Sequence, residues 1–203
     1  MHAARGLLAL VIICVAATGA SAGEWQLKPF IAVTYGGNAT YNLVPQPNNR
    51  AHFAFGASGM FLGEIFGIEG DFGHTPGFFQ DPTDSSQLIP DSGVTTATGN
   101  FVVAVPRHFV QYTLRPYIVG GAGVMHVAID YKFNLPTSST LKAMDLGAGV
   151  TGFLTKHLGV TWDVRYFRSI DRTFESGLSI GSEQLSFWRA NMAVAIRLKG
   201  GQQ

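Results

Sequence analysis

The chain has 203 residues, of which 14 are Lys or Arg and 13 are Asp or Glu, and this near-balance of charge excludes the electrostatic footprint of a nucleic-acid-binding protein. Charged residues make up 13% of the sequence and hydrophobic residues 46%, a combination that excludes an intrinsically disordered chain. The charged fraction is about half of the ~25% usual in soluble domains. The 25 glycines favour a β-protein with many tight turns.

Residues 1–22 have the three parts of a cleavable secretory signal peptide. Arg5 precedes an apolar run over residues 6–17, and small residues follow at 20–22. This run is shorter than the ~20 residues that a helix needs to cross a bilayer, so a retained membrane helix is the weaker alternative. We expect cleavage before Gly23.

Cleavage at this point leaves residues 23–203 as a single domain. It also removes Cys14, the only cysteine, so we expect neither disulfides nor thiol chemistry in the exported protein. From residue 23 onward the sequence has no apolar stretch of 18 residues, which excludes a helical membrane protein.

The exported part instead contains eight runs of about ten residues, rich in Val, Ile, Phe, Tyr, Gly and Ala, that alternate with a period of two. The predicted strands are residues 26–35, 51–62, 66–74, 95–105, 114–130, 141–153, 158–167 and 187–198. In the run 158–167, one face is apolar and carries Leu158, Val160, Trp162, Val164 and Tyr166. The other face is small or ionisable and carries Gly159, Thr161, Asp163, Arg165 and Phe167.

The connections between the predicted strands alternate in length. Long polar connections are predicted at residues 36–50, 75–94, 131–140 and 168–186, and shorter ones at 63–65, 106–113 and 155–157. Outer-membrane barrels have short periplasmic turns and long external loops. With both termini in the periplasm, the odd-numbered connections face outward, and these are the long ones.

These patterns predict an all-β fold, an eight-stranded antiparallel up-and-down transmembrane β-barrel. Runs of this length match the 9–11 residues of a membrane-spanning strand, and a sheet in lipid must close because no water can satisfy its edges. A soluble barrel would turn its apolar face inward, and alternation alone does not separate the two. The membrane is favoured because the opposite face carries mainly Gly, Ala and Thr. It is also favoured by large aromatic residues near strand ends, where an interfacial girdle lies: Trp25, Tyr35, Phe66, Tyr117, Tyr166 and Trp188.

Three segments resemble strands of the OmpA-like and OmpX-like outer-membrane β-barrel family. They are residues 114–123 (LRPYIVGGAG), 67–73 (GIEGDFG) and 159–167 (GVTWDVRYF). The resemblance implies an eight-stranded barrel in the bacterial outer membrane, with outer-membrane lipid as its surroundings.

Ionisable residues on the predicted inner face form a candidate lumen charge network: Glu69, Asp71, Asp163, Arg165, Arg189 and Arg197. Because the last two strands are neighbours, we expect Asp163 or Arg165 to pair with Arg189 or Arg197. A charged constriction on an ion path is one interpretation of such a set. Buried charges must be paired, however, so a structural network that fills a narrow barrel is the favoured interpretation.

Catalytic, metal-binding and cofactor-binding residues are not predicted. His126 resembles the histidine of lipid A deacylases of this barrel size, but the serine required two residues later is replaced by Ala128. The other mature histidines match no metal-ligand spacing. Phe78 and Phe79 fall in the predicted loop 75–94, where they suit either an adhesive patch or loop packing.

The sequence therefore predicts a non-enzymatic, monomeric outer-membrane barrel with a structural or surface-interaction role through its four long loops. It has no cofactor and no nucleic-acid partner in this prediction. A small passive channel is an alternative, although eight strands usually leave no aqueous pore. A soluble periplasmic barrel that binds an apolar ligand is another.

Overall fold

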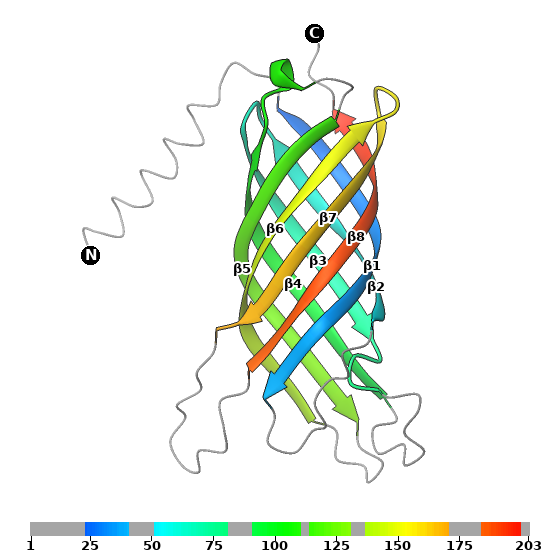
Figure 1. The fold of residues 1–203 in the computed structure, drawn as a ribbon, viewed down its shortest axis with the longest axis vertical. Helices are drawn as coiled ribbons and strands as arrows, with labels where there is room; N and C mark the ends of the chain where they lie inside the picture. Colours follow the sequence, from blue (N-terminus) through cyan, green and yellow to red (C-terminus); the bar gives the residue numbers. More distant parts are fainter. Residues whose placement is uncertain are drawn as a thin grey trace, which may run out of the picture.

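The computed structural model describes residues 23–40, 51–80, 91–110, 114–130, 137–170 and 184–199. They form a closed barrel in which every strand is hydrogen-bonded to its neighbours in sequence and β8 pairs with β1 (Figure 1). The strands are β1 Glu24–Thr40, β2 His52–Leu62, β3 Phe66–Pro76, β4 Asp91–Ala104, β5 Leu114–Asp130, β6 Thr137–Phe153, β7 Leu158–Ser169 and β8 Gln184–Lys199. A short 3-10 helix, η1 Arg107–Phe109, lies between β4 and β5. The predicted fold class is confirmed.

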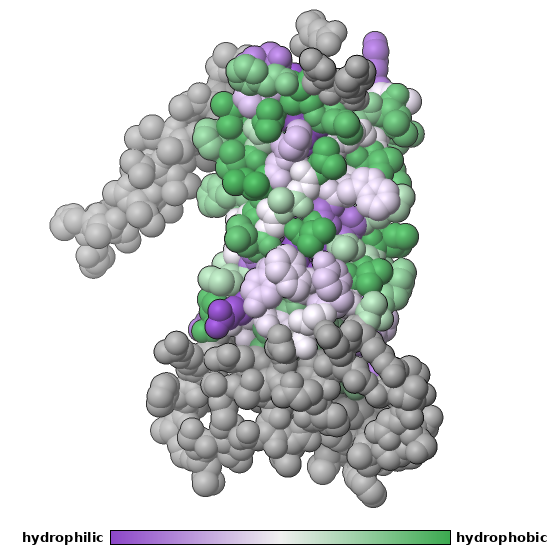
Figure 2. Space-filling view, viewed as in Figure 1, coloured by the Kyte–Doolittle hydropathy of each residue, from purple (hydrophilic) through white to green (hydrophobic). Residues whose placement is uncertain are grey.

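The alternation of side chains sorts them between the outer wall and the lumen. On β7, Trp162 is 55% exposed and the adjacent Thr161 only 1%, as the period of two requires. The other strands follow the same pattern, and large apolar side chains cover the visible wall of the barrel (Figure 2). An apolar outer wall is the reverse of a soluble barrel, so the interpretation as a soluble ligand-binding barrel is wrong.

The two ends of the barrel differ. The connections β2–β3, β4–β5 and β6–β7 lie at the end where β1 begins and β8 finishes, which we call the turn end (Figure 1). At the turn between β6 and β7, Thr155 Oγ1 accepts hydrogen bonds from the backbone N–H groups of His157 (3.3 Å) and Leu158 (3.0 Å). The opposite end, where β1, β3, β5 and β7 finish, is the loop end.

Several strands run further toward the loop end than predicted. β1 and β6 each have 17 residues, so the strand-to-loop boundaries expected at residues 36 and 140 are wrong. Segments such as 36–40 and 137–140 consist of Gly, Asn, Ala, Thr and Ser, which have no apolar face to produce a detectable alternation. Their ladder hydrogen bonds nevertheless continue beyond the apolar wall.

Aromatic side chains mark both margins of the apolar wall. Trp25 packs against Phe61 near the turn end, with ring centroids 5.1 Å apart. Nearer the loop end, Tyr166 packs against Trp188 at 5.0 Å, and Tyr35 is paired in register with Trp188. Tyr117 is the exception among the predicted girdle residues: it is 5% exposed and points into the lumen. Among the described residues, the structure has no helix long and apolar enough to cross a membrane.

Candidate functional site

The centre of the lumen is occupied by a cluster of buried charges, which we call the central cluster. Arg165 on β7 is its hub, with Nη2 3.1 Å from the carboxylate oxygens of both Glu69 and Asp163. Its Nε also donates to Asp163 Oδ1 at 3.2 Å. Because Glu69 belongs to β3, this guanidinium bridges strands on opposite sides of the barrel.

Arg189 on β8 makes a second bridge across the lumen. Its Nη2 donates to Asp71 Oδ1 at 2.6 Å, and Nη1 donates to Thr96 Oγ1 at 3.3 Å. The guanidinium lies between two aromatic faces, with its Cζ 4.7 Å from the centroid of Phe30 and 4.6 Å from that of Phe167. Arginine combines ion pairing and stacking in this way because its guanidinium is planar and weakly hydrated.

Neutral side chains add hydrogen bonds to two carboxylates of the cluster, Asp163 and Asp145. The Tyr117 hydroxyl donates to Asp163 Oδ2 at 2.8 Å, and Asn191 Nδ2 donates to Asp163 Oδ1 at 2.5 Å. The Asn100 amide, with its nitrogen turned toward Asp145, donates to Oδ1 of that residue at 2.8 Å. A buried polar network of this kind specifies one arrangement of the lumen because each unpaired member would be costly.

Lys28 lies on the turn-end side of these charges and is 2% exposed. Its Nζ is 3.4 Å from Met60 Sδ and 5.0 Å from the centroid of the Tyr117 ring. With Lys28 included, the buried central charges comprise three cations and four carboxylates: Lys28, Arg165, Arg189, Glu69, Asp71, Asp145 and Asp163. These seven central charges are therefore close to electrical balance, with one formal negative charge in excess.

Five of the six residues predicted for the lumen lie in this cluster, and Arg197 does not. Arg197 belongs to a separate group at the turn end, where its Nε lies 2.6 Å from Glu24 Oε2. Arg107 and Arg115 reach the same carboxylate at 2.8 and 3.3 Å. The alternation of their strands could have identified Glu24 and Arg115 as lumen residues. The sequence analysis did not include them because both lie close to the ends of their strands.

The pairing expected between the last two strands is wrong. The register places Arg165 directly opposite Arg189 and Asp163 opposite Asn191. The carboxylate that balances Arg189 comes from Asp71 on β3 instead. Neighbouring strands can place two like charges together here because their counter-ions approach from across the lumen.

Apolar clusters fill the lumen on both sides of the charges. Toward the loop end, Phe78 and Phe79 are 2% and 8% exposed, and Phe78 packs against His52 and Phe187 with ring centroids 5.6 and 5.3 Å apart. Of the two interpretations left open for this pair, the adhesive patch is wrong and packing is confirmed. Toward the turn end, a second cluster contains Met60, Leu62, Val102, Ala104, Tyr117 and Val119.

A turn at Gly77 places the side chains of Phe78 and Phe79 inside the barrel. Gly77 has a φ of +67°, a left-handed conformation that glycine adopts without the strain of a Cβ atom. Its N–H donates to the Ser92 carbonyl at 2.7 Å, and the Phe79 N–H donates to Ser92 Oγ at 3.1 Å. Phe78 and Phe79 belong to a larger apolar cluster, which we call the loop-end plug. Its other members are Val94, Met125, Val127, Leu141, Ala143, Phe167, Leu185 and Phe187.

The outer wall has a groove of about 410 Å³ that crosses β2, β3 and β4. Gly59, Gly70 and Gly99 are paired in register at this place. Phe61 and Phe101 are among the residues that line the groove. Because it opens on the apolar wall, it belongs to the lipid-facing surface.

The outward histidines near the loop end pair with threonines. His126 Nδ1 lies 2.8 Å from Thr140 Oγ1, and His74 Nδ1 lies 2.9 Å from Thr95 Oγ1. Neither imidazole has a carboxylate within ion-pair distance among the residues that the structure describes. The same described part contains no group of three His, Cys, Asp or Glu residues that could hold a metal ion.

Several solved structures share this fold at low sequence identity. The Neisserial surface protein A matches with a TM-score of 0.62 and 11% identity over 86% of this chain and 97% of that one. The N-terminal β-barrel domain of Pseudomonas aeruginosa OprF gives 0.53 and 13%, also over 86% and 97%. Ail, the attachment invasion locus protein of Yersinia pestis in complex with the heparin analogue sucrose octasulfate, gives 0.51 and 14% over 86% and 99%.

The search of the curated proteins found no significant match. The model of the outer membrane protein β-barrel domain, in contrast, matches residues 6–189, which is most of the chain. The closed barrel, its apolar outer wall and this match agree, and they place the protein in the bacterial outer membrane. The chain belongs to the outer membrane protein β-barrel domain family.

Proposed function

We propose that the protein is a non-enzymatic, monomeric barrel that acts as a rigid membrane platform for the segments joining its strands at the loop end. These are the connections β1–β2, β3–β4, β5–β6 and β7–β8, within the predicted loops 36–50, 75–94, 131–140 and 168–186. The platform gives them a fixed spacing at the cell surface, where they contact surface partners.

The observation that carries this proposal is the filled lumen. The loop-end plug, the central cluster and the turn-end group around Glu24 follow one another along the barrel. Side chains of an eight-stranded barrel can fill its interior completely. This favours a platform over the passive channel, because an ion would have to displace Arg189 and Arg165 from buried carboxylates.

The comparisons support a surface role only by analogy. One of the similar structures is named a surface protein and another an attachment protein. The lumen charges Glu69, Asp71, Asp163, Arg165 and Arg189 have a structural role in this proposal, and Arg197 has the same role at the turn end.

The test compares the barrel with a variant in which the four loop-end connections are replaced by short Gly-Ser segments. Both are displayed on a bacterial strain without other adhesins, and heat-modifiable gel migration verifies folding. We expect the variant to fold and to lose attachment of the cells to surfaces and to one another. Equal attachment by both barrels would refute the surface role, and a steady ion conductance of the wild-type barrel in planar bilayers would refute the platform.

A further inference from the structure

An aromatic platform lies on the outer wall where β7, β8 and β1 approach the loop end. Tyr166, Trp188 and Tyr35 form one row across these strands, because Trp188 is paired in register with both tyrosines. The rings of Tyr166 and Trp188 are 5.0 Å apart, and Trp188 and Tyr35 are 42% and 39% exposed. The indole N–H of Trp188 and the hydroxyl of Tyr35 have no hydrogen-bond partner among the described residues. The platform therefore offers apolar ring surface together with unused donors.

A bulge in β1 fixes the position of the indole. The pairing of β1 with β8 shifts between Tyr35 and Asn38, where β1 has one residue more than β8. Gly36 lies in this bulge with a φ of +64°, a conformation that glycine adopts without strain. A Cβ atom at Gly36 would lie 3.4 Å from Trp188 Cδ1, so the indole packs over the glycine. The ring of Tyr166 supports the indole from the other side, and the platform is therefore held in one arrangement.

An exposed arginine borders the platform on its loop-end side. Arg168 on β7 is paired with Ser186, which lies two residues from Trp188, so Arg168 and Trp188 are diagonal cross-strand neighbours. Such neighbours have Cα atoms about 7–8 Å apart, within reach of long side chains. The Arg168 guanidinium has no partner among the described residues, whereas Lys142, the other outward cation, already has an interaction of its own and is not part of the site. None of the outward side chains that the structure describes on β1 to β8 is a carboxylate.

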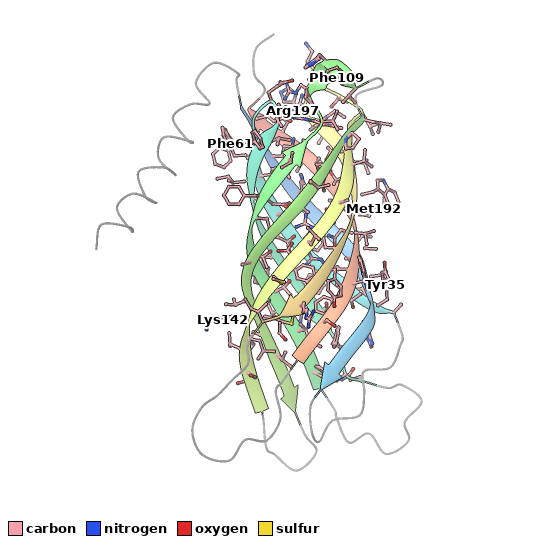
Figure 3. All side chains as sticks on the ribbon, turned by 60° about the vertical axis from the view of Figure 1, so that its left-hand side comes forward. Tyr35, Phe61, Phe109, Lys142, Met192 and Arg197 are labelled. Carbon is pink, nitrogen blue, oxygen red and sulfur yellow. The ribbon has the colours of Figure 1, made fainter. Side chains whose placement is uncertain are left out.

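The height of the platform on the barrel indicates what it meets. Tyr35 follows Trp25 by ten residues along β1, and Figure 3 shows Tyr35 nearer the loop end than Met192. Ten residues of a strand tilted by 35–45° rise about 25 Å along the barrel axis, the height of the apolar band of an outer-membrane barrel. Trp25 and Tyr35 therefore lie at opposite margins of this band. Because the short turns of such barrels are periplasmic, the platform lies among the headgroups of the outer leaflet.

We propose that Trp188, Tyr35 and Arg168 bind the phosphorylated sugar headgroup of a glycolipid in the outer leaflet. The face of the indole carries partial negative charge and packs against the weakly positive C–H groups of a sugar ring. The indole N–H and the Tyr35 hydroxyl donate to sugar oxygens, and Arg168 binds the phosphate through parallel N–H donors. A lipid is favoured over a soluble sugar because the platform opens sideways on the wall that meets the membrane. The site does not depend on the surface role proposed for the loops.

The test measures lipid retention by native mass spectrometry of the full barrel released from detergent. The probes are diphosphorylated lipid A, dephosphorylated lipid A, phosphatidylglycerol and a soluble glucosamine phosphate. The variants are R168Q and W188L, and heat-modifiable gel migration verifies that each is folded. The matched controls are K156Q, which removes an exposed lysine at the turn end, and W162L, which makes the same change as W188L at a ring that is 55% exposed in the middle of the wall.

We expect the two substitutions to act on different parts of the headgroup. R168Q weakens retention of diphosphorylated lipid A about 5-fold, the effect of one cation near an anionic headgroup, and leaves the dephosphorylated form unchanged. W188L weakens both forms of lipid A about 3-fold, the magnitude of one aromatic contact. K156Q and W162L retain both forms as the wild type does, and the wild type retains phosphatidylglycerol less than diphosphorylated lipid A.

Three outcomes would overturn the proposal. Wild-type retention of diphosphorylated lipid A by R168Q or by W188L would show that the named side chains do not bind the headgroup. Equal retention of phosphatidylglycerol and diphosphorylated lipid A by the wild type would show that the sugar is not recognised. Displacement of lipid A by glucosamine phosphate at the lipid's own concentration would assign the site to a soluble sugar phosphate instead.

Discussion

Arg165 and Arg189 lie directly opposite each other on β7 and β8, and both guanidinium groups reach Asp71 on the far wall of the lumen. The distances are 3.6 Å from Arg165 Nη1 and 2.6 Å from Arg189 Nη2. One carboxylate thus separates two cations that would otherwise repel each other. The arrangement makes the central cluster a structural unit whose members depend on one another.

Removing one charged member of the central cluster should therefore lower the free energy of unfolding of the barrel. Arg189→Ala leaves Asp71 buried without its closest cation, and we expect a loss of about 3–5 kcal/mol in the free energy of unfolding. Urea unfolding in lipid vesicles, followed by tryptophan fluorescence, measures the change. Lys156→Ala, an exposed substitution at the turn between β6 and β7, is the control and should change stability by about 0.5 kcal/mol or less. A large, ion-selective conductance of Arg189→Ala with unchanged stability would contradict the structural role.

Tyr117→Phe tests the position of this ring in the lumen. The substitution removes the hydroxyl that donates to Asp163 Oδ2 at 2.8 Å, and a hydrogen bond to a charged group contributes about 1.5–3 kcal/mol. We expect a lower urea midpoint with an unchanged slope. Tyr166→Phe, on the outer wall, serves as the comparison. If Tyr117→Phe is as stable as the wild type, the hydroxyl does not hold Asp163.

Phe78→Ala tests the loop-end plug. Truncation of a buried phenylalanine costs about 3–5 kcal/mol, and Phe72→Ala, whose ring is 55% exposed on the wall, should cost much less in lipid vesicles. We expect Phe78→Ala to remain non-conducting in planar bilayers because Arg189 and Asp71 still close the lumen beneath it. Channel openings in Phe78→Ala would show that the plug alone seals the barrel.

Gly123 and Gly99 differ in the space that is available for a Cβ atom. A Cβ atom at Gly123 would clash with the carbonyl oxygen of Ala97, whereas a Cβ at Gly99 meets nothing within 4 Å. We expect Gly123→Ala to cost about 1–3 kcal/mol through overpacking against backbone. Gly99→Ala should be neutral and should only narrow the outer groove. Heat-modifiable migration over a temperature series ranks the two variants, and equal midpoints would argue against the close approach of β4 and β5.

Spin labels on adjacent residues of β7 test which face meets lipid. A label at position 162 should be relaxed by oxygen, which dissolves in the bilayer, and one at position 161 should be shielded from both oxygen and a polar nickel reagent. These outcomes follow from the exposure of Trp162 and the burial of Thr161. Access of the polar reagent to position 162 at mid-strand would contradict the membrane-facing wall.

Much of the fold was predictable because alternation with a period of two is a property of local sequence. The faces of β3, β7 and β8 follow from it directly. The direction of Tyr117 did not, since β5 carries small and apolar residues on both faces and its register could not be read. The burial of Phe78 depends on the left-handed conformation of Gly77. The sequence predicts a loop at residues 75–94 but not the conformation of the backbone within it.

The sequence predicted five charged members of the central cluster, but it predicted neither Lys28 nor the pairing of the ions. Inward position identifies Glu69, Asp71 and Arg165 as lumen residues. Their contacts are set by the stagger of the closed sheet, which brings β3 opposite β7 and β8. The order of the strands along the chain shows only which strands are adjacent. The pairing of Arg189 on β8 with Asp71 on β3 could therefore not be predicted from the sequence.

The span of these ion pairs along the chain has a consequence for how the barrel assembles. Arg165 and Glu69 are separated by 96 residues, and Arg189 and Asp71 by 118. A partly formed sheet ending at β4 would carry both β3 carboxylates into the bilayer without their cations, which is costly in a low-dielectric medium. Insertion and closure should therefore occur together, and an isolated N-terminal half of the protein should not enter lipid bilayers on its own.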